Sequence, residues 1–562
     1  MRAVLLGMTA LLGAIVVSGV SWGDDSASFA IRNVDVFDGS TLKRAQDVIV
    51  RDGLISAVGA HLAIPTGLAV TEGTGKTLLP GLIDAHVHSW GASRSDALRF
   101  GVTTELDMFM DWHALAAART ARQSLARTAG SDLWSAGTLA TVPGGHGTEY
   151  GMEIPTLTAA SQAQSWVDDR VREGSDYIKI ILEPGFAQQP IPTLSPDEVA
   201  ALIAAAHHDG KMVLAHVHTL SDARLAATDG VDALAHVFYD QQADDSFVKL
   251  ARRRHLFVIA TLSVWSTAGC GPMAQTLAHD AALQPYLTSE QTGMLGVTFG
   301  SCSRALETAL KNVRILHQAG VPLLAGTDSG NPGTAHGASL LGEIELLVQA
   351  GLTPVEALAA ATSVPAAHFS LSDRGRIAPG KRADLVLIAG DPTREPAAIR
   401  HIAAVWKNGY QVERKPQQTA AAAVAGGFTV PAQFHPVHGP LAAQSPVPDY
   451  AGHIVLRGTS GDLDVTVGDE VFKGAWRAVA GGDAPAAAQA TDAAATLPQD
   501  WDLIYGAGYY KAHVQGNRLF SRALLSGNTG ATLTAEIIGE NNSFTGAARD
   551  SRGNVYKVTF GQ

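Results

Sequence analysis

Eight short apolar segments that alternate with amphipathic stretches constrain the fold of this chain more than any other feature of its sequence. The segments are residues 82–88, 102–109, 132–136, 177–182, 211–218, 233–238, 256–262 and 321–328. Apolar runs of this length, separated by helix-like stretches, are typical of parallel strands. Eight such units within residues 81–372 predict a (β/α)8 TIM barrel, an α/β fold that commonly uses about 250 residues.

Two of the intervening stretches carry signals for the start of a helix. Ser195-Pro-Asp-Glu198 and Thr353-Pro-Val-Glu356 each combine a capping box with a proline in the first turn. They predict helices over residues 196–209 and 354–369, which is the alternation that a barrel requires.

The segments that flank the barrel region are short and strand-like. We expect residues 28–80 and 373–412 to pair into one small β-sandwich domain beside the barrel. Residues 413–447 are rich in Ala, Pro and Gln, which predicts a linker. Residues 448–562 alternate again between apolar segments and turn signals, so we expect a separate all-β domain there.

The first 23 residues have the layout of a secretory signal peptide. A positive start is followed by apolar or small residues over 3–20, and small residues precede the polar Asp24. An uncleaved membrane anchor is the alternative, because an apolar run of this length approaches the roughly 20 residues that span a bilayer. The signal reading predicts a periplasmic or secreted protein that leaves the membrane once the segment is removed.

Composition excludes several classes of protein. The chain has 41 Lys and Arg against 53 Asp and Glu and shows no basic cluster, so we expect no nucleic-acid partner. Only Cys270 and Cys302 are present, which rules out a disulfide framework and a cysteine-ligated zinc site. In an oxidising compartment these two cysteines would be able to form one disulfide. The composition is compatible with a homo-oligomer as well as with a monomer.

Histidine and aspartate side chains stand at the ends of several predicted strands. His86 and His88 are two residues apart on one strand, so their side chains emerge on the same face. His216 and His236 end two further strands, and Asp328 ends the last. Because the carboxyl ends of barrel strands meet at one mouth, these four imidazoles and one carboxylate predict a site for a divalent metal such as zinc.

Lys179 lies in the apolar segment 177–182, where every neighbour belongs in a core. An unpaired buried ammonium group is costly, so this lysine needs a compensating arrangement. One interpretation is a side chain that reaches the barrel mouth or pairs with a carboxylate. The other is a neutral amine that has taken up carbon dioxide to form a carbamate, an anionic bridge between two metal ions.

Two sequence motifs, together with the strand-end residues above, show that the chain resembles a known family. Leu79-Pro-Gly-Leu-Ile-Asp-Ala-His-Val-His88 and Pro379-Gly-Lys-Arg-Ala-Asp-Leu-Val386 flank the barrel region. Over residues 28–412 the chain resembles the metal-dependent amidohydrolase superfamily, especially its imidazolonepropionase-like and exported dipeptidase-like branch. The resemblance implies two divalent ions, one held by His86, His88 and Asp328 and the other by His216 and His236, with carboxylated Lys179 as the bridge.

The resemblance also implies an activity and its substrate contacts. His146, in Gly145-His-Gly147, is similar to a loop histidine that contacts the scissile carbonyl, and Tyr239 to a residue that contacts the substrate carboxylate. The expected reaction is hydrolysis of an amide or peptide bond in a small substrate such as a dipeptide or N-acyl amino acid. A hydroxide that bridges the metals would attack, and Asp328 would accept the proton and pass it to the leaving nitrogen.

Several alternatives remain at this point. The chain can instead be a mononuclear cyclic-amide hydrolase without a carboxylated lysine, or an inactive barrel that serves as a surface binding protein. His218 shares a face with His216 and is a second candidate ligand, and Glu183 is a second candidate bridge. His336, in a glycine-rich loop, is a candidate substrate contact. Residues 263–302 form a long excursion that we expect to cover the site.

Overall fold

The computed structural model describes residues 27–148, 154–186, 189–269, 271–297, 304–417, 428–457, 460–478, 498–506, 510, 519–540 and 543–560. The predicted signal peptide and both cysteines lie outside the described residues. In the described part of the chain, no helix combines the length and the apolar character that crossing a membrane requires.

All eight predicted barrel strands are present. They are β6 (Leu82–Val87), β7 (Val102–Asp107), β8 (Asp132–Ser135), β9 (Ile178–Leu182), β12 (Val213–Val217), β13 (Ala233–Leu234), β14 (Phe257–Ile259) and β15 (Leu323–Leu324). Strands β6 to β8 form one parallel sheet, and β9 and β12 to β15 form another. Two parallel bridges, Ala140 to Ile180 and Val87 to Ser329, join these sheets on both sides, which closes the barrel.

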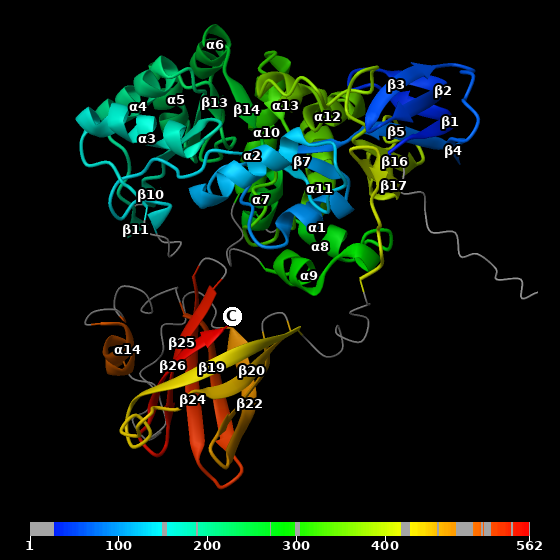
Figure 1. Cartoon of the computed structure of the whole chain (residues 1–562). Coiled ribbons are helices and arrows are strands. Elements are labelled where there is room, and N and C mark those ends of the chain that lie inside the picture. Colours follow the sequence, from blue (N-terminus) through cyan, green and yellow to red (C-terminus); the bar gives the residue numbers. More distant parts are fainter. Residues whose placement is uncertain are drawn as a thin grey trace, which may run out of the picture.

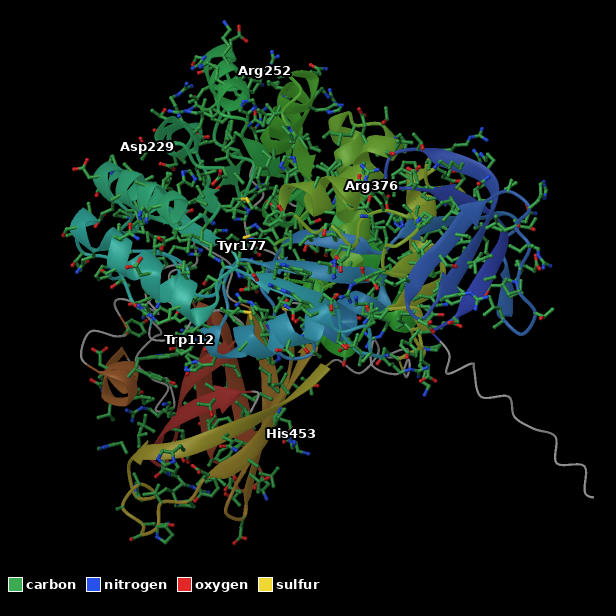
Figure 2. The ribbon with its side chains drawn as sticks, turned by 45° about the horizontal axis from the view of Figure 1, so that its top comes forward. Trp112, Tyr177, Asp229, Arg252, Arg376 and His453 are labelled. Carbon is green, nitrogen blue, oxygen red and sulfur yellow. The ribbon has the colours of Figure 1, made fainter. Side chains whose placement is uncertain are left out.

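The barrel has an apolar interior and a helical exterior. Ile83, Leu106, Leu214 and Phe257, from four different strands, form one buried cluster with Tyr177. Tyr177 is labelled in Figure 2. The outer faces of the strands pack against helices that surround them (Figure 1). These helices are α1 (Ser93–Arg99), α2 (Leu115–Gln123), α3 (Ala163–Glu173), α4 (Pro196–His208), α5 (Leu220–Asp229), α6 (Asp245–Arg253), α10 (Ala305–Gln318), α11 (Ala338–Ala350), α12 (Pro354–Ala360) and α13 (Ser363–His368).

Both predicted capping boxes are confirmed, but the second helix is shorter than expected. Ser195 and Glu198 cap α4, and Thr353 and Glu356 cap α12. The predicted helix over 354–369 is broken into α12 and α13. A continuous helix would place Pro365 in its interior, where the missing N–H and the ring clash cost about 3 kcal/mol. Restarting the helix at α13 places this proline in a first turn instead.

The excursion over residues 263–302 is largely helical in its described part. It contains α7 (Leu262–Ala268), α8 (Met273–Ala278) and α9 (Ser289–Leu295). Helix α7 begins directly after β14, so it extends the wall of the barrel at the carboxyl ends of the strands. Trp265 of α7 is buried there, and its indole N–H donates to the backbone oxygen of Val237 at 3.0 Å.

Strands that precede and follow the (β/α)8 barrel in the chain form one small β domain, as predicted. The early strands are β1 (Phe29–Phe37), β2 (Leu42–Arg51), β3 (Leu54–Gly59), β4 (Ala69–Glu72) and β5 (Lys76–Pro80), and the late ones are β16 (Leu385–Ala389), β17 (Ile402–Lys407) and β18 (Tyr410–Gln411). The antiparallel pair β5–β16 joins the two groups into a continuous eight-stranded sheet around a shared core. The hydrogen bonding therefore gives one sheet rather than the two of the predicted sandwich.

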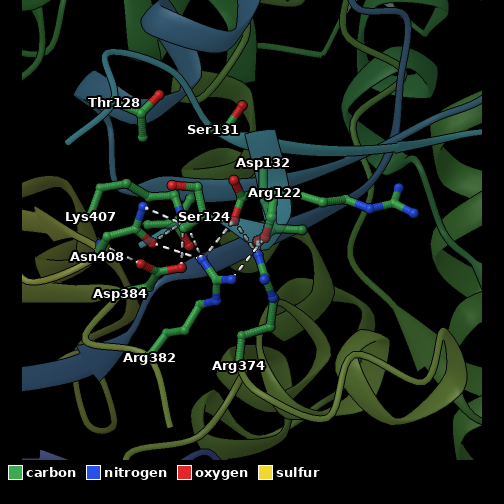
Figure 3. Close-up of polar contacts among 12 residues, drawn as sticks. Arg122, Ser124, Thr128, Ser131, Asp132, Arg374, Arg382, Asp384, Lys407 and Asn408 are labelled. Carbon is green, nitrogen blue, oxygen red and sulfur yellow. Dashed lines mark hydrogen bonds and ion pairs between the residues drawn. The ribbon is translucent and has the colours of Figure 1, made fainter. Parts of the chain in front are cut away.

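A buried ionic network fastens this domain to the start of β8 (Figure 3). The Asp132 carboxylate accepts from Arg374 at 2.5 Å and from Lys407 at 2.7 Å. Lys407 also donates to Asp384 at 2.7 Å, and Arg382 donates to the Asn408 side chain at 3.0 Å. Arg382 and Asp384 belong to the motif over residues 379–386, so that motif has a structural role at the domain junction.

Substituting the lysine of this network should destabilise the protein. Lys407 is 1% exposed, so Lys407→Met leaves the Asp132 and Asp384 carboxylates buried without their shared cation. Removing one partner of a buried ion pair costs about 3–5 kcal/mol, which should lower the midpoint of urea unfolding. Lys43→Met, which removes an ion pair whose lysine is 54% exposed, is the control and should leave that midpoint nearly unchanged. Equal midpoints for the two variants would contradict this role of the network.

The carboxy-terminal region is a closed antiparallel β barrel. Its strands are β19 (Phe428–His438), β20 (Tyr450–Arg457), β21 (Ser460–Val467), β22 (Glu470–Ala478), β23 (Leu519–Gly527), β24 (Thr532–Glu540), β25 (Ser543–Asp550) and β26 (Val555–Phe560). Phe434, Phe472, Trp476 and Tyr556 belong to its buried core. The prediction of an all-β domain is confirmed apart from helix α14 (Pro498–Tyr505), whereas the linker prediction is wrong for β19.

Strand β19 was missed because its composition is that of a linker. It contains Pro431 and Pro436, which lack the N–H that a ladder needs. In the barrel β19 pairs on both sides, and the register shifts between Pro436 and His438 in its pairing with β26. Burial of Ala432 and Phe434 in the barrel core offsets the lost hydrogen bonds.

Candidate metal centre

The pairing of the first and last barrel strands brings the first predicted set of ligands together. The backbone N–H of Asp328 donates to the backbone oxygen of His86 at 2.8 Å. The Asp328 Oδ1 atom then lies 3.2 Å from His86 Nε2 and 3.1 Å from His88 Nε2. Three potential ligand atoms from positions 240 residues apart in the chain therefore face one another.

The loop that carries Asp328 is held in an unusual conformation. Asp328 has a φ of 57°, in the left-handed region that costs a non-glycine residue conformational energy. The buried Asp84 carboxylate supports it by accepting from the Thr327 hydroxyl at 2.7 Å and from the Thr327 N–H at 3.1 Å. Gly326 must be glycine, because a Cβ there would lie 2.9 Å from the His86 Cβ. The surrounding structure thus over-determines the position of the Asp328 side chain.

A second set of nitrogen atoms lies beside the first. His216 Nδ1 and His236 Nε2 are 3.0 Å apart, and the His236 ring centroid is 4.5 Å from that of His86. The other nitrogen of His236 is 2.9 Å from the hydroxyl of Thr261. His86 Nδ1 likewise lies 2.7 Å from the carbonyl oxygen of Ala235, to which it donates. These outer contacts turn the Nε2 atoms of His86 and His236 toward the centre.

The atoms of this centre fit a divalent cation. His86 Nε2 and Asp328 Oδ1 are buried, and neither has a hydrogen-bond partner among the described residues. Leaving such atoms unsatisfied is costly, and an imidazole lone pair beside a carboxylate oxygen is a ligand set typical of zinc. Burial, with Lys179 adding to it, lowers the pKa of His86 to about 4, and burial also lowers the pKa values of His216 and His236. The rings are therefore neutral, which is the form that binds metals.

Lys179 lies among these ligands on β9. Its side chain is buried, and burial lowers its pKa to about 7. In the described part of the chain, no carboxylate forms an ion pair with its Nζ atom. The alternative in which Lys179 pairs with a carboxylate therefore lacks an ion pair to support it, whereas its place among the ligands at the barrel mouth is common to both interpretations.

The two predicted substrate contacts lie on one side of the ligands. His146 is in the loop after β8, and its ring centroid is 5.1 Å from that of His216. Tyr239 follows His236 closely in the chain, and its N–H donates to the backbone oxygen of His218 at 3.1 Å. Its ring lies 4.6 Å from that of Trp265, so the excursion supplies an aromatic wall beside the centre. All eight residues with a predicted role are thus brought to one end of the barrel.

Glu183, His218 and His336, the alternative candidates from the sequence, each contact another ionisable side chain. Glu183 Oε2 lies 3.3 Å from His216 Nε2 and forms an ion pair with His218 Nδ1, so Glu183, His216 and His218 form a second group with potential ligand atoms. His336 Nδ1 lies 2.9 Å from the carboxylate of the buried Glu105. His336 also lines a cleft with Trp90, outside both ligand groups.

Two acidic residues below the centre escaped the sequence analysis. Glu105 and Asp107 are fully buried on β7, and Asp107 accepts from the N–H of Ser89 at 2.7 Å. The signal that identified Lys179, a charged residue in an apolar segment, applies to both. Both accept hydrogen bonds from Ser89, so they hold the loop after β6 directly beside His88.

Comparison with known proteins identifies the catalytic region. The family described as "Amidohydrolase family" matches residues 77–412, more than half of the chain. The chain belongs to the amidohydrolase family. Ochratoxinase of Aspergillus niger is 25% identical over 446 residues, which cover 66% of this chain and 83% of that protein. Imidazolonepropionase of Deinococcus radiodurans is 28% identical over 372 residues, which cover 62% of this chain and 87% of that protein.

Solved structures agree with this assignment. A putative prolidase from Bifidobacterium longum is 26% identical with a TM-score of 0.57, covering 70% of this chain and 96% of that one. A Xaa-Pro dipeptidase with bound methionine has the same fold at 20% identity and a TM-score of 0.55, covering 69% of this chain and 100% of that one. The chain is therefore a metal-dependent hydrolase that acts on carbon–nitrogen bonds of small molecules, as the sequence predicts.

Metal binding should stabilise the folded protein measurably. Zinc at about 100 times its dissociation constant should stabilise the native state by about 2.7 kcal/mol. Adding zinc to chelator-treated protein should therefore raise the Tm measured by differential scanning fluorimetry. The rise should shrink in the double variant His86→Asn, His88→Asn.

The matched control is His207→Asn, at a histidine that is 42% exposed on α4 and remote from the centre. This variant should show the full rise in Tm. The assignment of the ligands would be wrong if the double variant and the control responded equally to zinc.

Proposed function

We propose that this protein hydrolyses an amide bond in small substrates such as dipeptides or N-acyl amino acids, with two divalent metal ions and a carbamate on Lys179. The observation that carries the proposal is the meeting of two ligand groups at one barrel mouth with a buried lysine between them. We expect zinc, because the ligand set is made of imidazoles and one carboxylate. We further propose, from residues 1–23 alone, that the protein is exported.

Each ion would have its own ligands. His86, His88 and Asp328 would hold one, His216 and His236 would hold the other, and the Lys179 carbamate would bridge them. Bound there, the ions would lower the pKa of a water molecule and polarise the substrate carbonyl.

Asp328 is the residue that we assign to proton transfer. Burial would raise the pKa of the Asp328 carboxyl, but the neighbouring imidazoles of His86 and His88 outweigh it and keep that pKa well below its usual range, so the carboxylate is ionised. The carboxylate lies among the ligand atoms, where it can accept the proton of the attacking water. The same carboxyl would then deliver that proton to the leaving nitrogen, which completes the cleavage.

His146 and Tyr239 would orient the substrate on the other side of the centre. His146 would donate to the oxygen of the scissile carbonyl, where negative charge develops. Burial raises the pKa of Tyr239 to about 12, so its hydroxyl keeps its proton and can donate to a substrate carboxylate. Trp265 beside it offers an apolar surface to the substrate's side chain.

The relatives support a small substrate with an amide bond. They also support a second candidate function. One relative is named ochratoxinase and a solved neighbour is described as a putative prolidase. The match to imidazolonepropionase favours the second candidate, a mononuclear cyclic-amide hydrolase. Burial of Lys179 next to both ligand groups supports the first, because a carbamate bridge gives this lysine a function. A product-release assay over dipeptides, N-acyl amino acids and cyclic amides tests the choice.

Replacing Asp328 should reduce turnover more than substrate binding. Asp328→Asn keeps the size of the side chain but removes the proton acceptor, so kcat should fall by about 10²–10⁴-fold. KM should change much less, because no substrate contact is lost. The measurement is steady-state kinetics on zinc-reconstituted protein whose metal content equals that of the wild type. Near-wild-type kcat in the metal-loaded variant would refute the assignment.

The carbamate predicts that reactivation depends on bicarbonate. The Lys179 amine would attack the carbon of carbon dioxide and lose one proton, which leaves an anionic carbamate. Chelator-treated protein should therefore regain activity slowly when zinc is added in carbon-dioxide-free buffer, and faster once bicarbonate is added. The comparison is Lys179→Ala, whose residual activity should not respond to bicarbonate. Equal reactivation rates of the wild type with and without bicarbonate would argue against a carbamate.

A further inference from the structure

We propose that Glu183 is a positioning residue that orients His216 toward the second metal ion and His218 toward the substrate. This inference rests on the proposed function, because it concerns the same site. Glu183 is 6% exposed in the turn after β9, and its carboxylate contacts both histidines of Val213-Leu-Ala-His-Val-His218. One carboxylate thus links a residue of the metal centre to a residue at its rim.

The two ring nitrogens of His216 face different partners. Nδ1 lies 3.0 Å from His236 Nε2, the arrangement expected of two ligands of one ion. Nε2 lies 3.3 Å from Glu183 Oε2. A ring that binds metal through Nδ1 must carry its proton on Nε2, and a carboxylate acceptor there fixes both the tautomer and the ring plane.

The alternative is that Glu183 itself binds an ion with His216 and His218. Glu183 and His218 contact each other directly, so a cation bound between them would have to replace that contact. Moreover, His216 would have to present Nε2 to that ion while Nδ1 points to His236. The orienting role needs neither condition, so the geometry favours it.

Glu183 is itself held in place. Its Oε1 atom accepts from the N–H of Gly185 at 2.9 Å, and its own N–H donates to the Thr193 hydroxyl at 3.0 Å. Gly185 has a φ of 69°, which a residue with a side chain would adopt only under strain. The carboxylate is therefore positioned before any ligand binds, which an orienting group requires.

His218 lies where a substrate contact is needed. Its side chain is 24% exposed, whereas that of His216 is 8% exposed. Its ring is 5.6 Å from Tyr239 and 5.0 Å from Trp265, the two aromatic side chains beside the centre. With Nδ1 held by Glu183, Nε2 is the ring nitrogen available to the polar end of the substrate. His218 thus becomes a specificity-determining residue next to Tyr239.

The test compares Glu183→Gln with the wild type. We expect the second zinc ion to bind about 10–100-fold more weakly in chelator-competition titrations, with the first ion unaffected, because outer-sphere partners of ligands have effects of this size. KM should rise as well, because His218 loses its orientation. His218→Ala should raise KM about tenfold while both zinc affinities stay at the wild-type values.

Glu198→Gln is the matched control, since Glu198 is also buried but belongs to the capping box of α4. It should leave both zinc affinities and KM unchanged. If Glu183→Gln does not fold, Glu183→Asp, which keeps the carboxylate on a shorter side chain, should weaken the second ion less than tenfold.

The outcomes separate this inference from the proposed function. Wild-type protein that binds no zinc and cleaves no amide would overturn the proposed function. Wild-type protein that does both, together with a Glu183→Gln variant whose second zinc affinity and KM equal those of the wild type, would overturn only the role of Glu183. An unchanged KM in His218→Ala would overturn the substrate contact.

Discussion

The closure of the barrel between β6 and β15 is the constraint on which the site depends. Backbone hydrogen bonds from Asp328 to His86 and from His88 to Ser329 join segments 240 residues apart. They place one carboxylate against two imidazoles, and the same closed ring of strands brings His216 and His236 to the same end. Closure in turn depends on the loop around Asp328, whose left-handed backbone is held by the buried Asp84.

Buried charged groups of the barrel are of two kinds: some are paired with an opposite charge, and others lack a hydrogen-bond partner within the described residues. The network of Asp132, Arg374 and Lys407 is buried but satisfied, and it joins the small β domain to the barrel. At the opposite ends of the strands, His86 Nε2 and Asp328 Oδ1 are buried without hydrogen-bond partners among the described residues. This contrast indicates that a cation belongs beside His86 Nε2 and Asp328 Oδ1.

Much of this arrangement could be predicted from the sequence, because strand ends of a barrel must converge. The periodicity located all eight strands, and the polar residues at their ends pointed to the candidate ligands that the barrel brings together. Ring orientation was not predictable, since it depends on partners from other strands such as Thr261 and the Ala235 carbonyl. The same applies to Glu183, whose contact with His218 depends on the turn after β9. Strand β19 was missed because its two prolines are typical of a linker and are unusual in a strand that pairs on both edges.

The central claim is a centre with two metal ions bridged through Lys179, and counting the ions tests it most directly. Inductively coupled plasma mass spectrometry of zinc-reconstituted protein should find two zinc ions per wild-type chain and at most one per Lys179→Ala chain. Two ions in both proteins would contradict the bridge, and one ion in the wild type would favour the mononuclear hydrolase. A wild-type chain that retains no zinc would contradict the account as a whole.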